Sequence, residues 1–103
     1  MTEYFELLQF FGGYLNPDWP DEYADEWAAL DDYLRDSPGV APAFRREMQA
    51  FLDEPLSDEE LQRILFYEFG CAFSAEAAGW KYRDWLKAIS DHAAKASGQS
   101  QAS

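Results

Sequence analysis

Apolar residues recur at intervals of three and four along almost the whole chain, and this spacing constrains the fold more than any other feature. The longest series is Tyr82, Trp85, Leu86, Ile89 and Ala93, which would form one continuous stripe along a helix. We find no segment with the alternating apolar and polar residues that are typical of a half-buried strand. The sequence therefore predicts an all-α protein.

The length of the chain limits it to one domain. Its 103 residues, of which 48% are hydrophobic, can form a single core but are too few for two. We expect a compact single-domain bundle of about five helices over residues 1–95. Residues 96–103 end in "SGQSQAS", a run of small and polar residues that predicts a disordered tail.

The first two predicted helices have clear sequence signals. The first covers about residues 3–12 and is expected to stop at the pair Gly12 and Gly13, since glycine commonly ends a helix. The second is expected to open near Pro20, because proline suits a first helical position. Its apolar stripe consists of Tyr23, Trp27, Leu30 and Leu34.

The later boundaries rest on proline, capping residues and glycine. The third helix should begin between Pro38 and Pro42 and continue through Leu52, because two prolines four residues apart do not fit one helix interior. Ser57 and Glu60 form a capping box, which predicts the start of the fourth helix. The remaining boundaries are a stop at Gly70, a loop over residues 71–80 and a last helix that contains Tyr82.

The sequence offers few groups for catalysis or metal binding. His92 is the one histidine and Cys71 the one cysteine, so histidine-rich and thiolate zinc sites are excluded. We interpret His92 as an exposed structural residue, Ser57 as a helix cap and Cys71 as a small buried hydrophobe. We therefore predict no catalytic residue, metal or cofactor, and a protein that is not an enzyme. A carboxylate-only Mg²⁺ or Ca²⁺ site is the one catalytic alternative left.

The charge of the chain narrows its possible partners. There are 20 Asp and Glu residues against 8 Lys and Arg, which gives a formal net charge of −12. Such a chain is not expected to bind nucleic acid phosphates or an anionic membrane surface, and a basic protein is the favoured partner. The single cysteine and the lack of a long apolar run indicate a reducing cytoplasm.

Acidic residues cluster in one part of the chain. The stretch "GYLNPDWPDEYADEW", residues 13–27, mixes large aromatic residues with carboxylates and contains no Lys, Arg or His. In the second predicted helix, like charges four residues apart would each destabilise the helix by a few tenths of a kcal/mol. These like-charge pairs are Asp21 with Asp25, Glu22 with Glu26, and Asp32 with Asp36.

Two interpretations of these acids remain open from the sequence. They form either a solvated face or a docking surface for a cationic protein. On one continuous helix, Glu22, Asp25, Asp32 and Asp36 would share a stripe with Ala29 in its middle. The candidate partner-binding residues are Asp21, Glu22, Asp25, Glu26, Asp32 and Asp36, and the loop from Cys71 to Trp80 is the next candidate.

Three blocks of the sequence carry a family resemblance. They are "LLQFFGGYLNPDWPDEY", "LSDEELQRIL" and "AAGWKYRDWLKAI". In order and spacing, over roughly residues 5–92, the chain resembles the small helical immunity proteins of bacterial contact-dependent growth inhibition systems. The motif residues that we interpret as structural are Tyr14, Asp18, Trp19, Ser57, Gly79, Tyr82 and Trp85.

The resemblance implies a function. Proteins of that family are cytoplasmic antidotes without enzymatic activity, which bind the C-terminal toxin domain of an effector, often a nuclease. A basic toxin domain would suit the negative charge of this chain, and we expect the free chain to be a monomer. The alternative is an acidic mimic of nucleic acid that inhibits a DNA- or RNA-binding protein.

Overall fold

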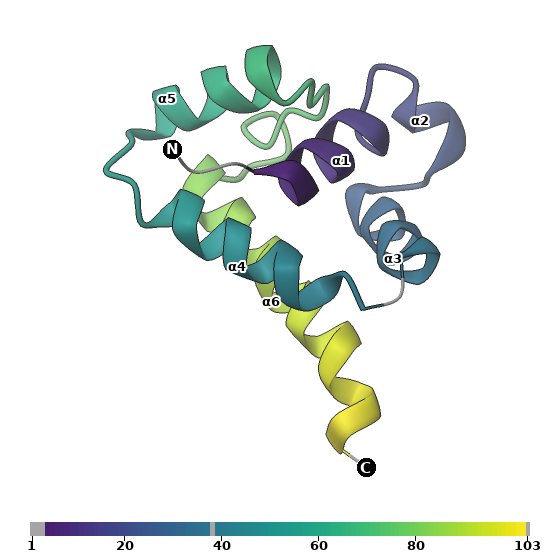
Figure 1. The fold of residues 1–103 in the computed structure, drawn as a ribbon. Coiled ribbons are helices and arrows are strands. Elements are labelled where there is room, and N and C mark those ends of the chain that lie inside the picture. The colour runs from purple at the N-terminus through teal and green to yellow at the C-terminus, as the bar shows by residue number, and fades with distance from the viewer. Residues whose placement is uncertain (1–3, 38, 103) are drawn as a thin grey trace.

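Helices make up every regular element in the part of the chain that the structure describes. The computed structural model describes residues 4–37 and 39–102, and Figure 1 shows the arrangement of its elements. The helices are α1 (Phe5–Gly13), α2 (Trp19–Glu22), α3 (Glu26–Asp36), α4 (Ala41–Leu52), α5 (Asp58–Arg63), the π-helix η1 (Ile64–Glu68) and α6 (Tyr82–Ala102). The predicted all-α class is confirmed.

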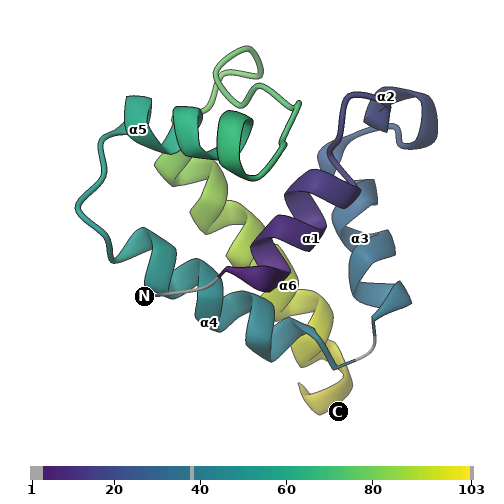
Figure 2. The same cartoon turned by 45° about the horizontal axis from the view of Figure 1, so that its top comes forward.

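The long helix α6 organises the bundle. It packs against α3, α4 and α5, and α1 packs against α4. Figures 1 and 2 show α3 and α5 at opposite sides of the molecule, with α1 between them. Elements far apart in the sequence therefore share one core.

Aromatic rings fill most of that core. Phe10, Phe11, Phe44 and Trp85 are fully buried. The ring centroids of Phe10 and Phe44 lie 5.7 Å apart, and those of Phe11 and Trp85 lie 5.8 Å apart. These contacts join α1 to α4 and α6, as edge-to-face and tilted ring pairs commonly do in protein interiors.

The second predicted helix is divided in two, so the expected continuous helix from Pro20 is wrong. Tyr23 ends α2 in an extended conformation, with φ −133° and ψ 143°. Asp25 then caps α3, because its Oδ1 accepts a hydrogen bond from the backbone N–H of Ala28 at 2.8 Å. An aspartate that can cap a new helix competes with continuation of the old one.

The predicted capping box at the start of α5 is confirmed. Ser57 Oγ accepts from the backbone N–H of Glu60 at 3.1 Å, and Glu60 Oε1 accepts from the backbone N–H of Ser57 at 2.9 Å. The hydrogen bond from the Ser57 backbone N–H, followed by the Ser57 hydroxyl, lowers the pKa of the Glu60 carboxyl below its ordinary value. The carboxylate of Glu60 is therefore held in its charged form at the positive end of α5.

The helix that starts at Ser57 changes its winding before it stops. Over Ile64–Glu68 it becomes the π-helix η1, and the backbone N–H of Phe69 donates to the carbonyl of Ile64 at 3.1 Å. Leu65 and Phe69 are buried on its inner side. The chain leaves the helix at Gly70, as predicted. The π-helix itself was not predicted from the sequence.

Gly12 allows α1 to approach the end of η1 closely. A Cβ atom at position 12 would lie 2.6 Å from the carbonyl oxygen of Phe69. At Gly13, by contrast, a Cβ atom would meet nothing within 4 Å. Gly12 is thus required by packing between elements, and α1 runs through both glycines rather than stopping at Gly12.

The starts of α4 and α6 agree with the prediction. α4 begins at Ala41, between Pro38 and Pro42, and α6 begins at Tyr82. Residue 3, the predicted start of the first helix, lies outside the described residues, as do Pro38 and Ser103. α6 continues through Ala102, beyond the predicted limit at residue 95. Disorder of residues 96–103 in solution stays a prediction.

Candidate partner-binding surface

The segment that contains α2 and α3 concentrates the negative charge of the chain. Between Asn16 and Ser37 there are eight acidic residues and one basic residue, Arg35. Six of these acids are exposed, and we refer to them as the acidic surface: Asp18, Asp21, Glu22, Asp25, Asp31 and Asp36. Figure 1 shows α2 and α3 together along one side of the molecule.

Asp21 and Glu22 are members of this surface whose carboxylates take no part in the hydrogen bonds within the described fold. Both lie in the short helix α2 and are exposed. Within the described part of the chain, neither carboxylate accepts a hydrogen bond. Their charges remain available to a partner.

Asp32 has an internal role. Its Oδ2 accepts from the Tyr23 hydroxyl at 2.5 Å, and its Oδ1 accepts from Arg35 Nη2 at 2.7 Å. The Tyr23 hydrogen bond, followed by the Arg35 guanidinium, lowers the pKa of the Asp32 carboxyl below its ordinary value. Asp32 is half-buried and joins the end of α2 to α3.

Asp25 and Asp36 are exposed but also serve the fold. Asp25 caps α3, and the Tyr14 hydroxyl donates to Asp36 Oδ2 at 3.0 Å. Burial, followed by the Asp36 hydrogen bond, raises the pKa of the Tyr14 hydroxyl. These neutral donors offset part of the like-charge repulsion in this segment.

Glu26 and Ala29 do not lie on the acidic surface, which corrects the prediction. Glu26 is only 6% exposed, and its Oε2 accepts from Trp85 Nε1 at 3.1 Å. Ala29 is fully buried rather than central to an exposed stripe. The break at Tyr23 gives α3 its own orientation, with Glu26 and Ala29 both turned toward the core. Glu26 is therefore a structural residue of the core.

The predicted structural residues occupy different environments. Trp85 is fully buried and Tyr82 is 4% exposed, so both belong to the core. Trp19 is half-buried and meets the ring of Phe73 at 5.5 Å, centroid to centroid. Gly79 has a φ of +92°, a left-handed conformation that glycine adopts without strain.

Asp18 is exposed, although we predicted it as a structural residue. It occupies the N-cap position of α2, but its side chain makes no cap hydrogen bond. Its backbone N–H donates to Asn16 Oδ1 at 3.0 Å, so the turn is fixed by Asn16. The carboxylate of Asp18 thus adds to the acidic surface.

His92 links α6 to α3. Its Nε2 lies 2.7 Å from Asp31 Oδ1, and its ring packs against Trp27 with the centroids 5.4 Å apart. The side chain of His92 is 33% exposed. These contacts give it a structural role at the edge of the acidic surface.

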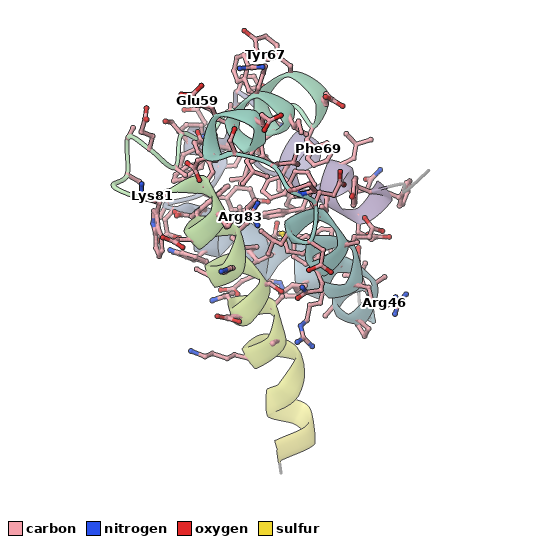
Figure 3. The ribbon with its side chains drawn as sticks, turned by 90° about the vertical axis from the view of Figure 1, so that its left-hand side faces the viewer. Arg46, Glu59, Tyr67, Phe69, Lys81 and Arg83 are labelled. Carbon is pink, nitrogen blue, oxygen red and sulfur yellow. The ribbon has the colours of Figure 1, made fainter. Side chains whose placement is uncertain are left out.

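The structural roles of two residues, Asp58 and Arg83, were not predicted from the sequence. Asp58 accepts from the backbone N–H groups of Tyr82 and Arg83 at 2.9 and 3.0 Å, which caps α6. Arg83 donates to the carbonyls of Leu52 and Leu56 at 2.7 and 2.8 Å and holds the connection between α4 and α5 (Figure 3). No local pattern pairs residues this far apart in the chain.

The described residues do not assemble a metal site or a reactive thiol. Among them, no three His, Cys, Asp or Glu side chains are placed to hold a metal ion. Burial raises the pKa of the Cys71 thiol to about 12, so it stays protonated at neutral pH. In the same part of the chain, no helix has the length and apolar character needed to cross a membrane.

A small helical domain with an acidic surface, and with its aromatic residues largely committed to the core, has the features of a protein that binds another protein. A model of the CdiI immunity protein family matches residues 3–93. The chain belongs to this family, and the resemblance to immunity proteins of contact-dependent growth inhibition is confirmed. No curated protein and no solved structure matches the chain.

Proposed function

We propose that this immunity protein neutralises the C-terminal toxin domain of a cognate effector by binding it through the acidic surface. The toxin domain is basic and acts as a nuclease. In this proposal the chain works in the cytoplasm as a monomer and binds neither nucleic acid nor membrane. It has no catalytic activity, because it inhibits by contact.

The observation that carries this proposal is the group of exposed acids on α2 and α3. A nuclease needs a positive groove for its substrate, and an acidic surface is attracted to that groove. Such complementarity raises the association rate and selects against partners of the wrong charge. Family membership supports a toxin as the partner.

The contacts inside this surface refine the set of candidate residues. Reversal of Asp25, Asp32 and Asp36 would remove a helix cap and two tyrosine partners, so loss of binding could then follow from damage to the fold. Asp21 and Glu22 have no such internal role in the described structure. They are the residues with which docking can be tested separately from folding.

The test compares two double variants with equal changes of charge. Asp21→Lys with Glu22→Lys alters α2, and Asp84→Lys with Asp91→Lys alters exposed positions of α6. Asp84, like the α2 pair, lies in a first helical turn, so part of the cost to the helix dipole is matched. Association is measured with the purified C-terminal domain of the effector encoded beside this chain.

We expect the α2 variant to associate at least about tenfold more slowly at low salt, with a flatter salt dependence. The α6 variant should stay close to wild type, and both should keep the wild-type circular dichroism spectrum. Equal association of the two variants would exclude α2 from the interface. Similar, steeply salt-dependent binding of wild type to unrelated basic proteins would instead identify a mimic of nucleic acid.

A further inference from the structure

Two large aromatic side chains on η1 lie outside the core. Phe66 is 56% exposed and Tyr67 is 76% exposed. Their rings meet edge to face, with centroids 4.9 Å apart. Exposed aromatic residues that pack against each other are costly to hydrate and commonly mark a contact site.

Phe66 and Tyr67 lie on the outer side of η1. Leu65 and Phe69 occupy its inner side, and the bond from the Phe69 N–H to the Ile64 carbonyl spans five residues. Phe66 and Tyr67 fall between the two inner residues and therefore face outward. Figure 3 shows Tyr67 projecting beyond the ribbon of the bundle. Single turns of π-helix that follow an α-helix, as here, frequently occur at functional sites.

The exposed rings border an open pocket of about 530 Å³. Its lining consists of Phe66, Tyr67, Gln62, Arg63, Glu59 and Glu76. A smaller pocket of about 210 Å³ also involves Phe66 and reaches toward Cys71 and Tyr82. The rings are thus part of a concave surface formed by α5, η1 and the loop over residues 71–80.

The charge of this surface identifies the kind of occupant. The two carboxylates of Glu59 and Glu76 outnumber the single guanidinium of Arg63 in the pocket. Aromatic faces beside carboxylates suit the apolar stem and cationic end of a lysine or arginine side chain. A second copy of this chain would bring another net charge of −12, which opposes association.

We propose that Phe66 and Tyr67 form the aromatic anchor of the interface with the basic toxin domain, with a lysine or arginine of the toxin seated in the adjoining pocket. This inference rests on the proposed function and adds a second contact to it. Figures 1 and 2 both place η1 and α2 on the upper side of the bundle, with the end of α1 between them. One partner that spans the end of α1 would therefore contact α2 and the anchor together.

The anchor is tested by truncation of its rings. Phe66→Ala with Tyr67→Ala is compared with Phe5→Ala and Leu8→Ala, which truncate side chains of α1 that are 58% and 44% exposed. Affinity for the same purified toxin domain is measured by calorimetry. We expect the η1 variant to bind at least about tenfold more weakly than the α1 variant.

A smaller difference in affinity between the two variants would contradict the proposed anchor. A wild-type protein that is a dimer, and that becomes a monomer in the η1 variant, would also contradict it. If the double variant does not fold, Tyr67→Ala alone is held to the same tenfold criterion, because this side chain is 76% exposed.

Glu59→Gln with Glu76→Gln should also weaken binding and reduce its salt dependence. If this glutamine variant binds as well as wild type, a lysine or arginine of the toxin does not occupy the pocket. If wild type does not bind the toxin domain, the proposed function fails first.

Discussion

At the scale of single residues, Glu26 shows how a carboxylate in an acidic segment can have a wholly internal role. It is 6% exposed and accepts a hydrogen bond from Trp85 Nε1. This bond joins the first turn of α3 to α6, and the positive end of the α3 dipole favours a negative charge there. Asp21 and Glu22 of the neighbouring α2, by contrast, are exposed and accept no hydrogen bond in the described part of the chain.

Trp85 supports a prediction at this scale. Trp85→Ala should destabilise the protein by about 3–5 kcal/mol, because the ring is fully buried. Trp85→Phe should still cost about 1–3 kcal/mol, since it leaves Glu26 buried without its donor. Trp19→Ala should cost less than Trp85→Ala, because Trp19 is only half-buried.

Urea unfolding followed by far-UV circular dichroism gives these free energies. The double variant Glu26→Gln with Trp85→Phe is the informative control, because it replaces the Glu26 carboxyl with a neutral amide. Its loss of unfolding free energy should be smaller than the sum of the losses in the two single variants. A Trp85→Phe protein as stable as wild type would show that the Glu26 bond contributes nothing.

At the scale of elements, the ends of the helices are fixed by contacts between elements. Asp58 belongs to α5 but caps α6, and Arg83 belongs to α6 but holds the connection between α4 and α5. Gly12 belongs to α1, and its lack of a side chain lets the end of η1 approach. These contacts place η1, and with it the exposed pair Phe66 and Tyr67.

The two adjacent glycines of α1 give a prediction at this scale. Gly12→Ala should destabilise the protein by about 1–3 kcal/mol, because the new Cβ atom would lie 2.6 Å from the Phe69 carbonyl oxygen. Gly13→Ala is the matched control and should be neutral or stabilising by up to about 1 kcal/mol, because it meets nothing within 4 Å. Thermal melting of both variants measures the difference, and equal melting temperatures would contradict the close approach.

At the scale of the whole molecule, one aromatic core carries a strongly negative surface. The core draws rings from α1, α3, α4 and α6, whereas the exposed acids of α2 and α3 lie along one side. The formal net charge of −12 favours a basic partner and disfavours self-association. Stability of this arrangement comes from packing of the helices around this core.

This organisation predicts that metal removal has no effect on folding. Excess EDTA should leave the melting temperature unchanged at constant ionic strength, because the described residues hold no cluster of metal-binding side chains. Differential scanning calorimetry with and without EDTA measures this. A fall of several degrees would indicate a structural metal and contradict the expectation.

The sequence by itself determined the helical class, the capping box at Ser57, the stop at Gly70 and the membership of Trp85 in the core. Those features follow from spacing, caps and glycine, which act within a few residues of each other. Only the tertiary structure decided that Glu26 is buried, that Asp58 caps α6, and that Phe66 and Tyr67 are exposed on a π-helix. Each of these depends on a partner or a packing surface supplied by another element, and no local pattern in the chain specifies which element that is.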